Sequence, residues 1–187
     1  DKDLPYFAKG IEIGEMLGND QFLMDAYRTV VMLASYSGKS ELVKYFYGKD
    51  IQVAKRCGDT FEEAMVYNGL GYNCCTTEEY LKANENFNQA LKIFHELGLS
   101  DYIIETVYNM AINAFMACDY KNATEYFERT LYLLNINRKN SLRVCNISKV
   151  FGLIALAYFH HGHVYATRNY LMKDAQFLDY IVDKDDE

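Results

Sequence analysis

A forty-residue period constrains this 187-residue chain more than any other feature of its sequence. The same step joins three glycines and four aromatic residues, namely Gly18, Gly58 and Gly98, and Phe7, Tyr47, Phe87 and Phe127. A fixed period of this size is typical of one supersecondary unit that is repeated along the chain, because each copy buries its apolar face only by stacking on its neighbours. We therefore expect a stack of similar units.

The sequence predicts that each unit consists of helices. The chain has a single proline, Pro5, and its apolar residues recur at spacings of three and four. The predicted helices run over about 4–17, 21–36, 39–57, 60–75, 78–97, 101–118, 120–135, 142–161 and 164–182. The short connections force neighbouring helices to run antiparallel. A longer loop at 135–141 delays the last pair by about four residues relative to the period.

Short polar residues and glycines mark the predicted helix ends. Asp20 and Asp119 are predicted to cap the helices that follow them. Two pairs resemble capping boxes, in which a side-chain oxygen and a later carboxylate satisfy two free amide donors: Asp59 or Thr60 with Glu63, and Thr76 with Glu79. The three glycines of the period lie where the residue after a helix adopts a positive φ.

Two copies in the middle of the chain resemble the tetratricopeptide repeat. One copy has Tyr67-Asn68-Gly69-Leu70-Gly71-Tyr72 followed by Tyr80, Ala83, Phe87 and Ala90, and the next has Tyr108-Asn109-Met110-Ala111 followed by Tyr120, Ala123 and Phe127. The resemblance implies an all-α fold, a right-handed α-solenoid of stacked antiparallel helix pairs. In it, small residues let the helices of a pair approach, and aromatic residues fill the gap to the next pair.

The resemblance covers the whole chain as a single domain of residues 1–187. It implies a half repeat at 1–18 and repeats at about 20–58, 60–98, 100–138 and 142–182. The long repeat is similar to that of scaffold proteins and of the sensor regions of bacterial regulators, including receptors for short signalling peptides. Because Asp1 already lies inside the second helix of a repeat, we expect the chain to be a piece of a longer protein.

Composition limits the partners and the compartment. The chain has 19 Lys and Arg against 26 Asp and Glu, a net charge of −7, so we expect no direct binding of nucleic acid. Its apolar runs are shorter than the roughly eighteen residues of a membrane span, and no signal peptide opens it. Five cysteines without a CxxC pair favour reduced thiols and therefore the cytoplasm.

The sequence contains no recognisable catalytic machinery. It lacks the P-loop, dinucleotide, zinc-protease and hydrolase motifs, so we predict that the chain is not an enzyme and needs no cofactor. His160, His161 and His163 are the cluster best suited to a metal. They lie at a helix end and turn, where histidine also interacts favourably with the helix dipole, and no Cys or carboxylate stands at a ligand-like spacing. We predict no metal site.

The family resemblance implies a binding site on the concave face, because the first helix of each tetratricopeptide pair lines that face. Counting from the small landmark residues gives the predicted peptide-binding set of Arg28, Met32, Asn68, Tyr72, Tyr108, Asn109 and Ile112, continued by Thr29, Lys149, Leu153 and Leu156. An asparagine amide can donate to and accept from a peptide backbone, and an aromatic ring supplies flat apolar area. Two alternatives stay open. The asparagines cap or bridge neighbouring helices, and Arg28 pairs with Asp25 or Glu62 instead of a ligand carboxylate.

Two functions fit these residues. The first is a ligand-sensing domain, in which a short peptide changes the pitch of the stack and thereby alters an attached effector. The second is a constitutive scaffold that docks a protein partner or, as a homodimer, a second copy of itself. Exposed apolar residues near the ends, such as Phe7, Phe177, Tyr180 and Ile181, would supply the contact surface for the scaffold.

Overall fold

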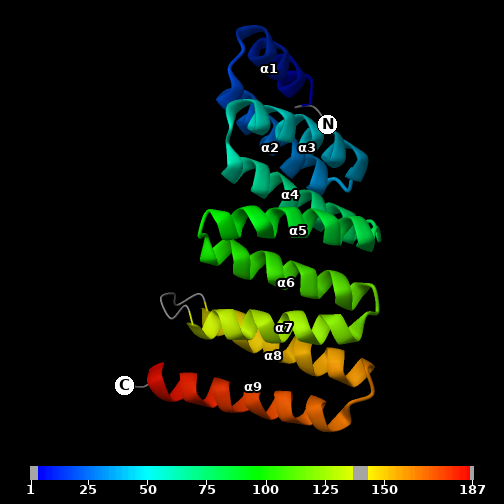
Figure 1. Ribbon diagram of the computed structural model, residues 1–187, viewed down its shortest axis with the longest axis vertical. Coiled ribbons are helices and arrows are strands. Elements are labelled where there is room, and N and C mark those ends of the chain that lie inside the picture. The colour runs from blue at the N-terminus through cyan, green and yellow to red at the C-terminus, as the bar shows by residue number, and fades with distance from the viewer. Residues whose placement is uncertain (1–3, 137–142, 186–187) are drawn as a thin grey trace. The chain divides into compact units, whose positions relative to one another are not determined.

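The computed structural model describes residues 4–136 and 143–185, and within these ranges it contains nine α-helices and no strand. The helices are α1 (Leu4–Leu17), α2 (Asp20–Tyr36), α3 (Ser40–Cys57), α4 (Thr60–Thr76), α5 (Tyr80–Glu96), α6 (Ser100–Met116), α7 (Tyr120–Ile136), α8 (Arg143–His160) and α9 (Val164–Asp185). The all-α fold of stacked antiparallel helix pairs is confirmed (Figure 1). Most of the predicted loop at 135–141 lies outside the described residues.

The period of the sequence is also the period of the structure. Helices α2, α4 and α6 begin at residues 20, 60 and 100, and helices α3, α5 and α7 begin at residues 40, 80 and 120. A residue with left-handed backbone recurs at every twentieth position, and the series is Gly18, Gly38, Gly58, Glu78, Gly98 and Cys118. The predicted delay is confirmed, since α9 begins at residue 164 instead of 160.

Two predicted helix caps are wrong. The N-cap of α2 is Asn19, whose side chain accepts a hydrogen bond from the Phe22 amide at 3.1 Å, so Asp20 is the first residue of the helix instead. Thr76 is the last residue of α4, and its hydroxyl donates to the Asn73 carbonyl at 2.8 Å. It therefore cannot cap α5. The short turn through left-handed Glu78 leaves no room for an earlier helix start.

Unit 1 of the two compact units into which the helices cluster is Asp1–Gly98. Its helices pack most extensively within the pairs α2/α3 and α4/α5, and each pair closes around buried apolar side chains. A Cβ on Gly71 of α4 would lie 2.6 Å from the Phe87 ring of α5, which shows why this landmark position needs a small residue. The predicted close approach of the two helices is confirmed for this pair.

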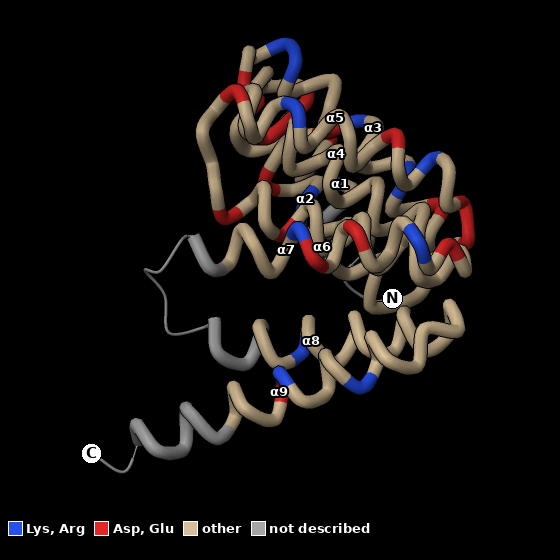
Figure 2. Tube along the Cα trace, turned by 60° about the horizontal axis from the view of Figure 1, so that its bottom comes forward, with Lys and Arg blue, Asp and Glu red and all other residues tan. Residues whose placement is uncertain are grey.

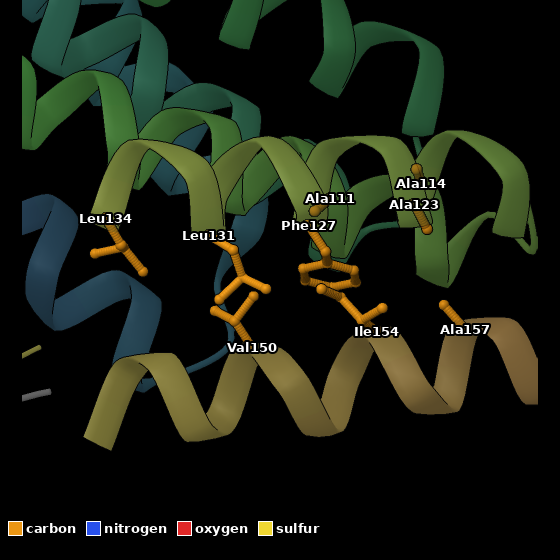
Figure 3. Packing of buried hydrophobic residues seen from close by; sticks show 9 residues of the cluster. All are labelled: Ala111, Ala114, Ala123, Phe127, Leu131, Leu134, Val150, Ile154 and Ala157. Carbon is orange, nitrogen blue, oxygen red and sulfur yellow. The ribbon is translucent and has the colours of Figure 1, made fainter. Parts of the chain in front are cut away.

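Unit 2 is Leu99–Glu187, and its core fills the space between α6, α7 and α8. Figure 3 shows this cluster, which consists of Ala111, Ala114, Ala123, Phe127, Leu131, Leu134, Val150, Ile154 and Ala157. Phe127 is fully buried and lies against side chains of the following pair, as the repeat pattern predicts. That residues 1–187 form a single repeat domain stays a prediction.

Candidate peptide-binding faces

The first helices of unit 1, α2 and α4, meet through an ion pair. The Arg28 guanidinium on α2 donates from Nη1 to Glu62 Oε2 on α4 at 3.2 Å, and it also pairs with Asp25 of its own helix. Both partners that the sequence offered to Arg28 are therefore engaged. The Arg28 side chain keeps 46% of its surface exposed, so a ligand can still reach it.

Besides Arg28, the accessible predicted residues on unit 1 are the apolar ones. Met32 is 50% exposed and Tyr72 is 60% exposed, whereas Asn68 is only 7% exposed and has a partner within the protein. We call Arg28, Met32, Asn68 and Tyr72 the unit 1 face. On this face the thioether and the phenol offer most of the area to a ligand, and the asparagine amide offers little.

The predicted residues of unit 2 lie closer to its core. Tyr108 packs against Phe127 with ring centroids 6.0 Å apart, and Ile112 also contacts the apolar cluster. The Lys149 ammonium of α8 lies 5.9 Å from the centroid of the Tyr108 ring, which brings α6 and α8 together as the row of residues predicted. We call Tyr108, Asn109, Ile112, Lys149 and Leu156 the unit 2 face. Asn109 is half-buried and also has a partner.

One position of the repeat carries an apolar side chain on all four first helices. These residues are Met32 on α2, Tyr72 on α4, Ile112 on α6 and Leu156 on α8. Met32, Tyr72 and Leu156 are 50%, 60% and 43% exposed, and Ile112 is partly buried. Large apolar side chains that stay accessible at one register are typical of a binding surface, because burial in the core does not account for them.

Sequence reasoning missed Asp50 and the burial of Glu62, two acids that lie beside the unit 1 face. Asp50 of α3 is fully buried and Glu62 of α4 is 4% exposed. A signal was present in the period, because the positions equivalent to Asp50 hold Gly10, Ala90 and Thr130, and Asp174 in the last pair, which begins four residues late. An acid at a place that three other copies fill with small, uncharged residues marks a local departure from the repeat, and such departures concentrate at functional sites.

Burial controls the protonation of these two acids. Burial, together with the negative charge of Glu62, raises the pKa of Asp50 to about 7. Burial also raises the pKa of Glu62, although the Arg28 guanidinium opposes that rise. The pKa of the Tyr47 phenol rises for the same reasons, first burial and then the charges of Asp50 and Glu62. Near neutral pH, Asp50 therefore keeps its proton in part of the molecules.

Two hollows in unit 1 lie away from the predicted residues. One of about 410 Å³ is lined by α1, α2 and α3, with the Arg56–Asp20 ion pair in its wall and the Tyr27 side chain at its base. The other, of about 700 Å³, lies over the start of α3 beside Tyr45. Neither is lined by Arg28, Met32, Asn68 or Tyr72, so the unit 1 face is a surface and does not coincide with either hollow.

The histidines at the end of α8 take part in aromatic packing. The His160 ring stacks on Tyr120 with centroids 5.1 Å apart, and the His161 and His163 rings meet edge to face at 4.6 Å. Across the described ranges, no group of three His, Cys, Asp or Glu side chains is placed to hold a metal ion. No helix within the described parts of the chain has both the length and the apolar character that crossing a bilayer requires.

Comparison with protein families places a known repeat in the middle of the chain. Residues 62–135 match the family model of the tetratricopeptide repeat. These residues include the two copies that carry the sequence resemblance. A search of curated protein sequences gave no match.

Solved structures with the same fold come from several functional settings. BtubC (BKLC) from P. vanneervenii superposes with a TM-score of 0.84 at 14% identity, over 96% of this chain and 73% of that chain. The apo form of RapI gives 0.74 at 14% identity, over 87% of this chain and 44% of that chain. A Signal Transduction ATPase with Numerous Domains with a tetratricopeptide repeat sensor, PH0952 from Pyrococcus horikoshii, gives 0.68 at 16% identity, over 98% and 35%. Likeness at such identity shows the fold alone.

Proposed function

Since this chain is a tetratricopeptide repeat protein, we propose that it binds a protein segment or a short peptide along the first helices of its repeats. The carrying observation is the accessible apolar position at Met32, Tyr72 and Leu156, which recurs in register. A peptide that crosses the first helices of unit 1 would meet Met32 and Tyr72, and one that crosses the first helices of unit 2 would meet Ile112 and Leu156. Repeated shallow apolar contacts suit an extended or a helical peptide better than a compact small molecule.

Polar groups beside this apolar position supply the rest of the proposed site. Arg28 offers a guanidinium, and Asn68 and Asn109 offer amides that can bind a peptide backbone. Lys149 of α8 lies beside Tyr108 and extends the row with a cation. The proposed site residues are thus the predicted ones, Arg28, Met32, Asn68, Tyr72, Tyr108, Asn109 and Ile112.

We further propose that the chain is the sensing or interaction module of a larger cytoplasmic regulatory protein, and that it is not itself an enzyme. The chain spans 44% of RapI and 35% of the signal-transduction ATPase, whose tetratricopeptide repeats are a sensor. The buried thiols of Cys74 and Cys75 are compatible with a reducing compartment. A constitutive scaffold, with or without a homodimer, is the alternative that uses the same surface and needs no switch.

A binding measurement on surface variants tests the proposal. Met32→Ser with Tyr72→Ser should weaken the capture of peptides from an immobilised random-peptide array at least tenfold, because both changes remove accessible apolar area. Tyr45→Ser is the matched control, since Tyr45 is 58% exposed on the second helix α3. Equal loss in both variants, or loss only in the control, would contradict the assignment of the binding face.

A second measurement separates the sensor from the scaffold. Spin labels placed on α2 and α5 should change their distance when a captured peptide is added, if the domain is a sensor whose helix pairs rearrange. An unchanged distance under saturating peptide favours the scaffold. Asn68→Ala combined with Asn109→Ala should weaken capture while the helical circular dichroism signal stays constant.

A further inference from the structure

The junction between α3 and α4 departs from the repeat at two positions that meet in space. The carboxyls of Asp50 on α3 and Glu62 on α4 are near enough for each to influence the pKa of the other. The positions equivalent to Glu62 hold the aromatic residues Phe22 and Tyr102. Two buried acids oppose folding, because burial disfavours their charged forms. Packing α3 against α4 therefore does not require them.

Two neighbours are adapted to the same junction. The position of Tyr47 is phenylalanine in the equivalent places 7, 87 and 127, so the hydroxyl is particular to this copy. Gly69 of α4 faces that hydroxyl, and a Cβ at residue 69 would overlap it. The equivalent positions hold Thr29, Asn109 and Leu153, whose side chains would occupy the space that Gly69 leaves for the Tyr47 hydroxyl. Tyr47, Glu62 and Gly69 thus differ from the other copies at one place, and Asp50 has an acidic counterpart only in Asp174 of the last pair.

The buried carboxyls lack donors. Within the described parts of the chain, neither oxygen of Asp50 nor Oε1 of Glu62 accepts a hydrogen bond from an N–H or a hydroxyl group. The two acids can bond each other only while one of them keeps its proton. Asp50 is fully buried, so its unpartnered oxygens cannot be explained by exposure to bulk water. Native proteins rarely leave a buried polar group without a partner, and an ion or a functional role is among the explanations of those that occur.

The charges at the junction do not balance. Three carboxyls, those of Asp25, Asp50 and Glu62, surround the single guanidinium of Arg28. Of these four side chains, Arg28 is the one that can change its position, because it is 46% exposed and has a second partner, Asp25, on its own helix. If Arg28 leaves Glu62, it stays paired with Asp25, so its displacement costs little.

We propose that this acidic junction, formed by Asp25, Asp50 and Glu62, is a subsite for a cationic group of the bound peptide, either a Lys or Arg side chain or an N-terminal ammonium. The cation takes the place of Arg28 beside Glu62. The proposal rests on the proposed function, because Arg28 lies one helical turn before Met32 on the unit 1 face. The net charge of −7 attracts cationic ligands over a longer range.

Occupation of the subsite should release a proton. The charged or titratable groups that act on Asp50 are Asp25, Tyr27 and Arg28 from α2, Tyr47 from its own helix, and Glu62 from α4. Because Arg28 stays at the junction on Asp25 while the ligand's cation arrives beside Glu62, the junction as a whole gains a positive charge. This charge favours the ionised form of Asp50, so its pKa falls when the peptide binds. At pH 6.5, where Asp50 is largely protonated before binding, the proton leaves to solvent.

An array of immobilised pentapeptides tests the subsite directly. The peptides share apolar flanking residues and carry Arg, Lys, citrulline, Gln or Glu at the centre, each with a free or an acetylated N-terminus. The wild-type chain should prefer Arg or Lys to citrulline and Gln at least tenfold, or should prefer the free N-terminus if the ammonium is the ligand. Glu62→Gln should abolish the preference. Glu63→Gln, next to it in the sequence and paired with Lys55 at 3.4 Å, should keep it.

Proton release by Asp50 on binding gives a second measurement, which a change in packing alone would not alter. Titration of the Arg pentapeptide at pH 6.5 in buffers of different ionisation enthalpy should show proton release by the wild type, whereas Asp50→Asn should bind more weakly and release no proton per peptide bound. Equal binding of all central residues and both N-termini, or an unchanged preference in Glu62→Gln, would overturn the subsite and leave the proposed function standing. Failure of every pentapeptide to bind would overturn both.

Discussion

Unit 1 and unit 2 share one repeat but join their helices with different polar contacts. Five ion pairs link separate segments of unit 1: Arg28–Glu62, Lys44–Glu79, Lys49–Glu15, Lys55–Glu63 and Arg56–Asp20. In unit 2 the Glu128 carboxylate of α7 accepts hydrogen bonds from the hydroxyls of Tyr158 on α8 at 2.9 Å and Tyr170 on α9 at 2.6 Å. Figure 2 shows charged residues throughout unit 1 and few along the described parts of α8 and α9.

The contrast shows that buried apolar side chains stabilise the helix pairs in both units. The polar contacts between helices can therefore differ between the units without changing the fold. Exposed ion pairs contribute about 0–1 kcal/mol each, so the pairs of unit 1 cannot be what holds it together. In unit 2 the Tyr158 and Tyr170 rings stack with centroids 5.6 Å apart, and their hydroxyls both find an acceptor. The acids at the α3–α4 junction find no donor beyond Arg28. The carboxyl oxygens of this junction, like Oδ1 of Asp174 in unit 2, are therefore polar atoms that the packing leaves without a donor.

The largest expected effect comes from the aromatic residues at the centres of the two units. Phe127→Ala should lower the free energy of unfolding of unit 2 by about 3–5 kcal/mol, because a fully buried ring leaves a cavity. Phe87→Ala should do the same in unit 1. Hydrogen exchange resolves the amides of each unit and measures both losses. If each variant raised exchange equally in both units, the units would not be separate packing entities.

The pH dependence of stability should separate the units next most strongly. Asp50 titrates at about 7 when folded and near 3.8 when unfolded, so the folded state holds the additional proton between these values. The free energy of unfolding therefore falls as pH rises from about 4 to about 7, by an amount on the order of 2–4 kcal/mol. Asp50→Asn should remove this loss and make unit 1 more stable than the wild type at pH 8.

Urea denaturation at pH 5 and pH 8, with hydrogen exchange assigned to unit 1, measures that change. Asp20→Asn is the matched control, because Arg56 lowers the pKa of the exposed Asp20. The stability that Asp20 contributes is fully present above its unfolded pKa, so the control variant should lose the same amount at pH 5 and pH 8 and keep the pH slope of the wild type. A pH slope that survives in Asp50→Asn would contradict the assignment of this titration.

A smaller effect is expected at the tyrosine–carboxylate link of unit 2. Tyr170→Phe removes one donor to Glu128 and should cost about 1–2 kcal/mol, since hydrogen bonds to a charged acceptor are stronger than neutral ones. Tyr132→Phe, at a residue of α7 that is 65% exposed, is the control and should cost almost nothing. Thermal unfolding of the two variants measures the difference. Equal midpoints would show that the link does not contribute to unit 2.

The smallest effects belong to the turns that both units share. Glu78 in unit 1 and Cys118 in unit 2 have φ values of 63° and 59°, where glycine occupies the equivalent places. Glu78→Gly and Cys118→Gly should each raise the free energy of unfolding by up to about 1 kcal/mol, because glycine avoids the steric cost of a left-handed residue. Chemical denaturation of both variants checks this. A loss of stability in either would mean that its side chain contributes more than its backbone costs.

The repeat made most of the fold predictable from sequence. Gly18, Gly58 and Gly98 marked helix ends correctly because a left-handed residue is needed at each of those turns. Thr76 misled because the capping-box pattern does not distinguish the start of one helix from the end of the previous one, and Thr76 is the last residue of α4, where its hydroxyl donates to the Asn73 carbonyl. The partner of Arg28 was predictable, since Glu62 is the acid that neighbouring first helices bring near it.

The candidate site was less predictable than the fold. Exposure of Met32 and burial of Asn68 depend on how far each first helix is rotated, which a one-dimensional pattern does not define. Asp50 could be found from the sequence only by comparing each residue with the residues at the equivalent positions of the other copies. The homodimer through Phe177 and its neighbours stays a prediction, and the side chains of Phe7, Tyr180 and Ile181 lie outside the described residues.

Photo-crosslinking from two matched tyrosine positions tests most directly whether the first helices bind the ligand. A benzoylphenylalanine placed at residue 72 on α4 or at residue 45 on α3 has nearly the same exposure, 60% and 58% for the native side chains. With any peptide that the chain captures, the crosslink should form from position 72 and be absent from position 45. A crosslink from position 45 alone would contradict the proposed binding face.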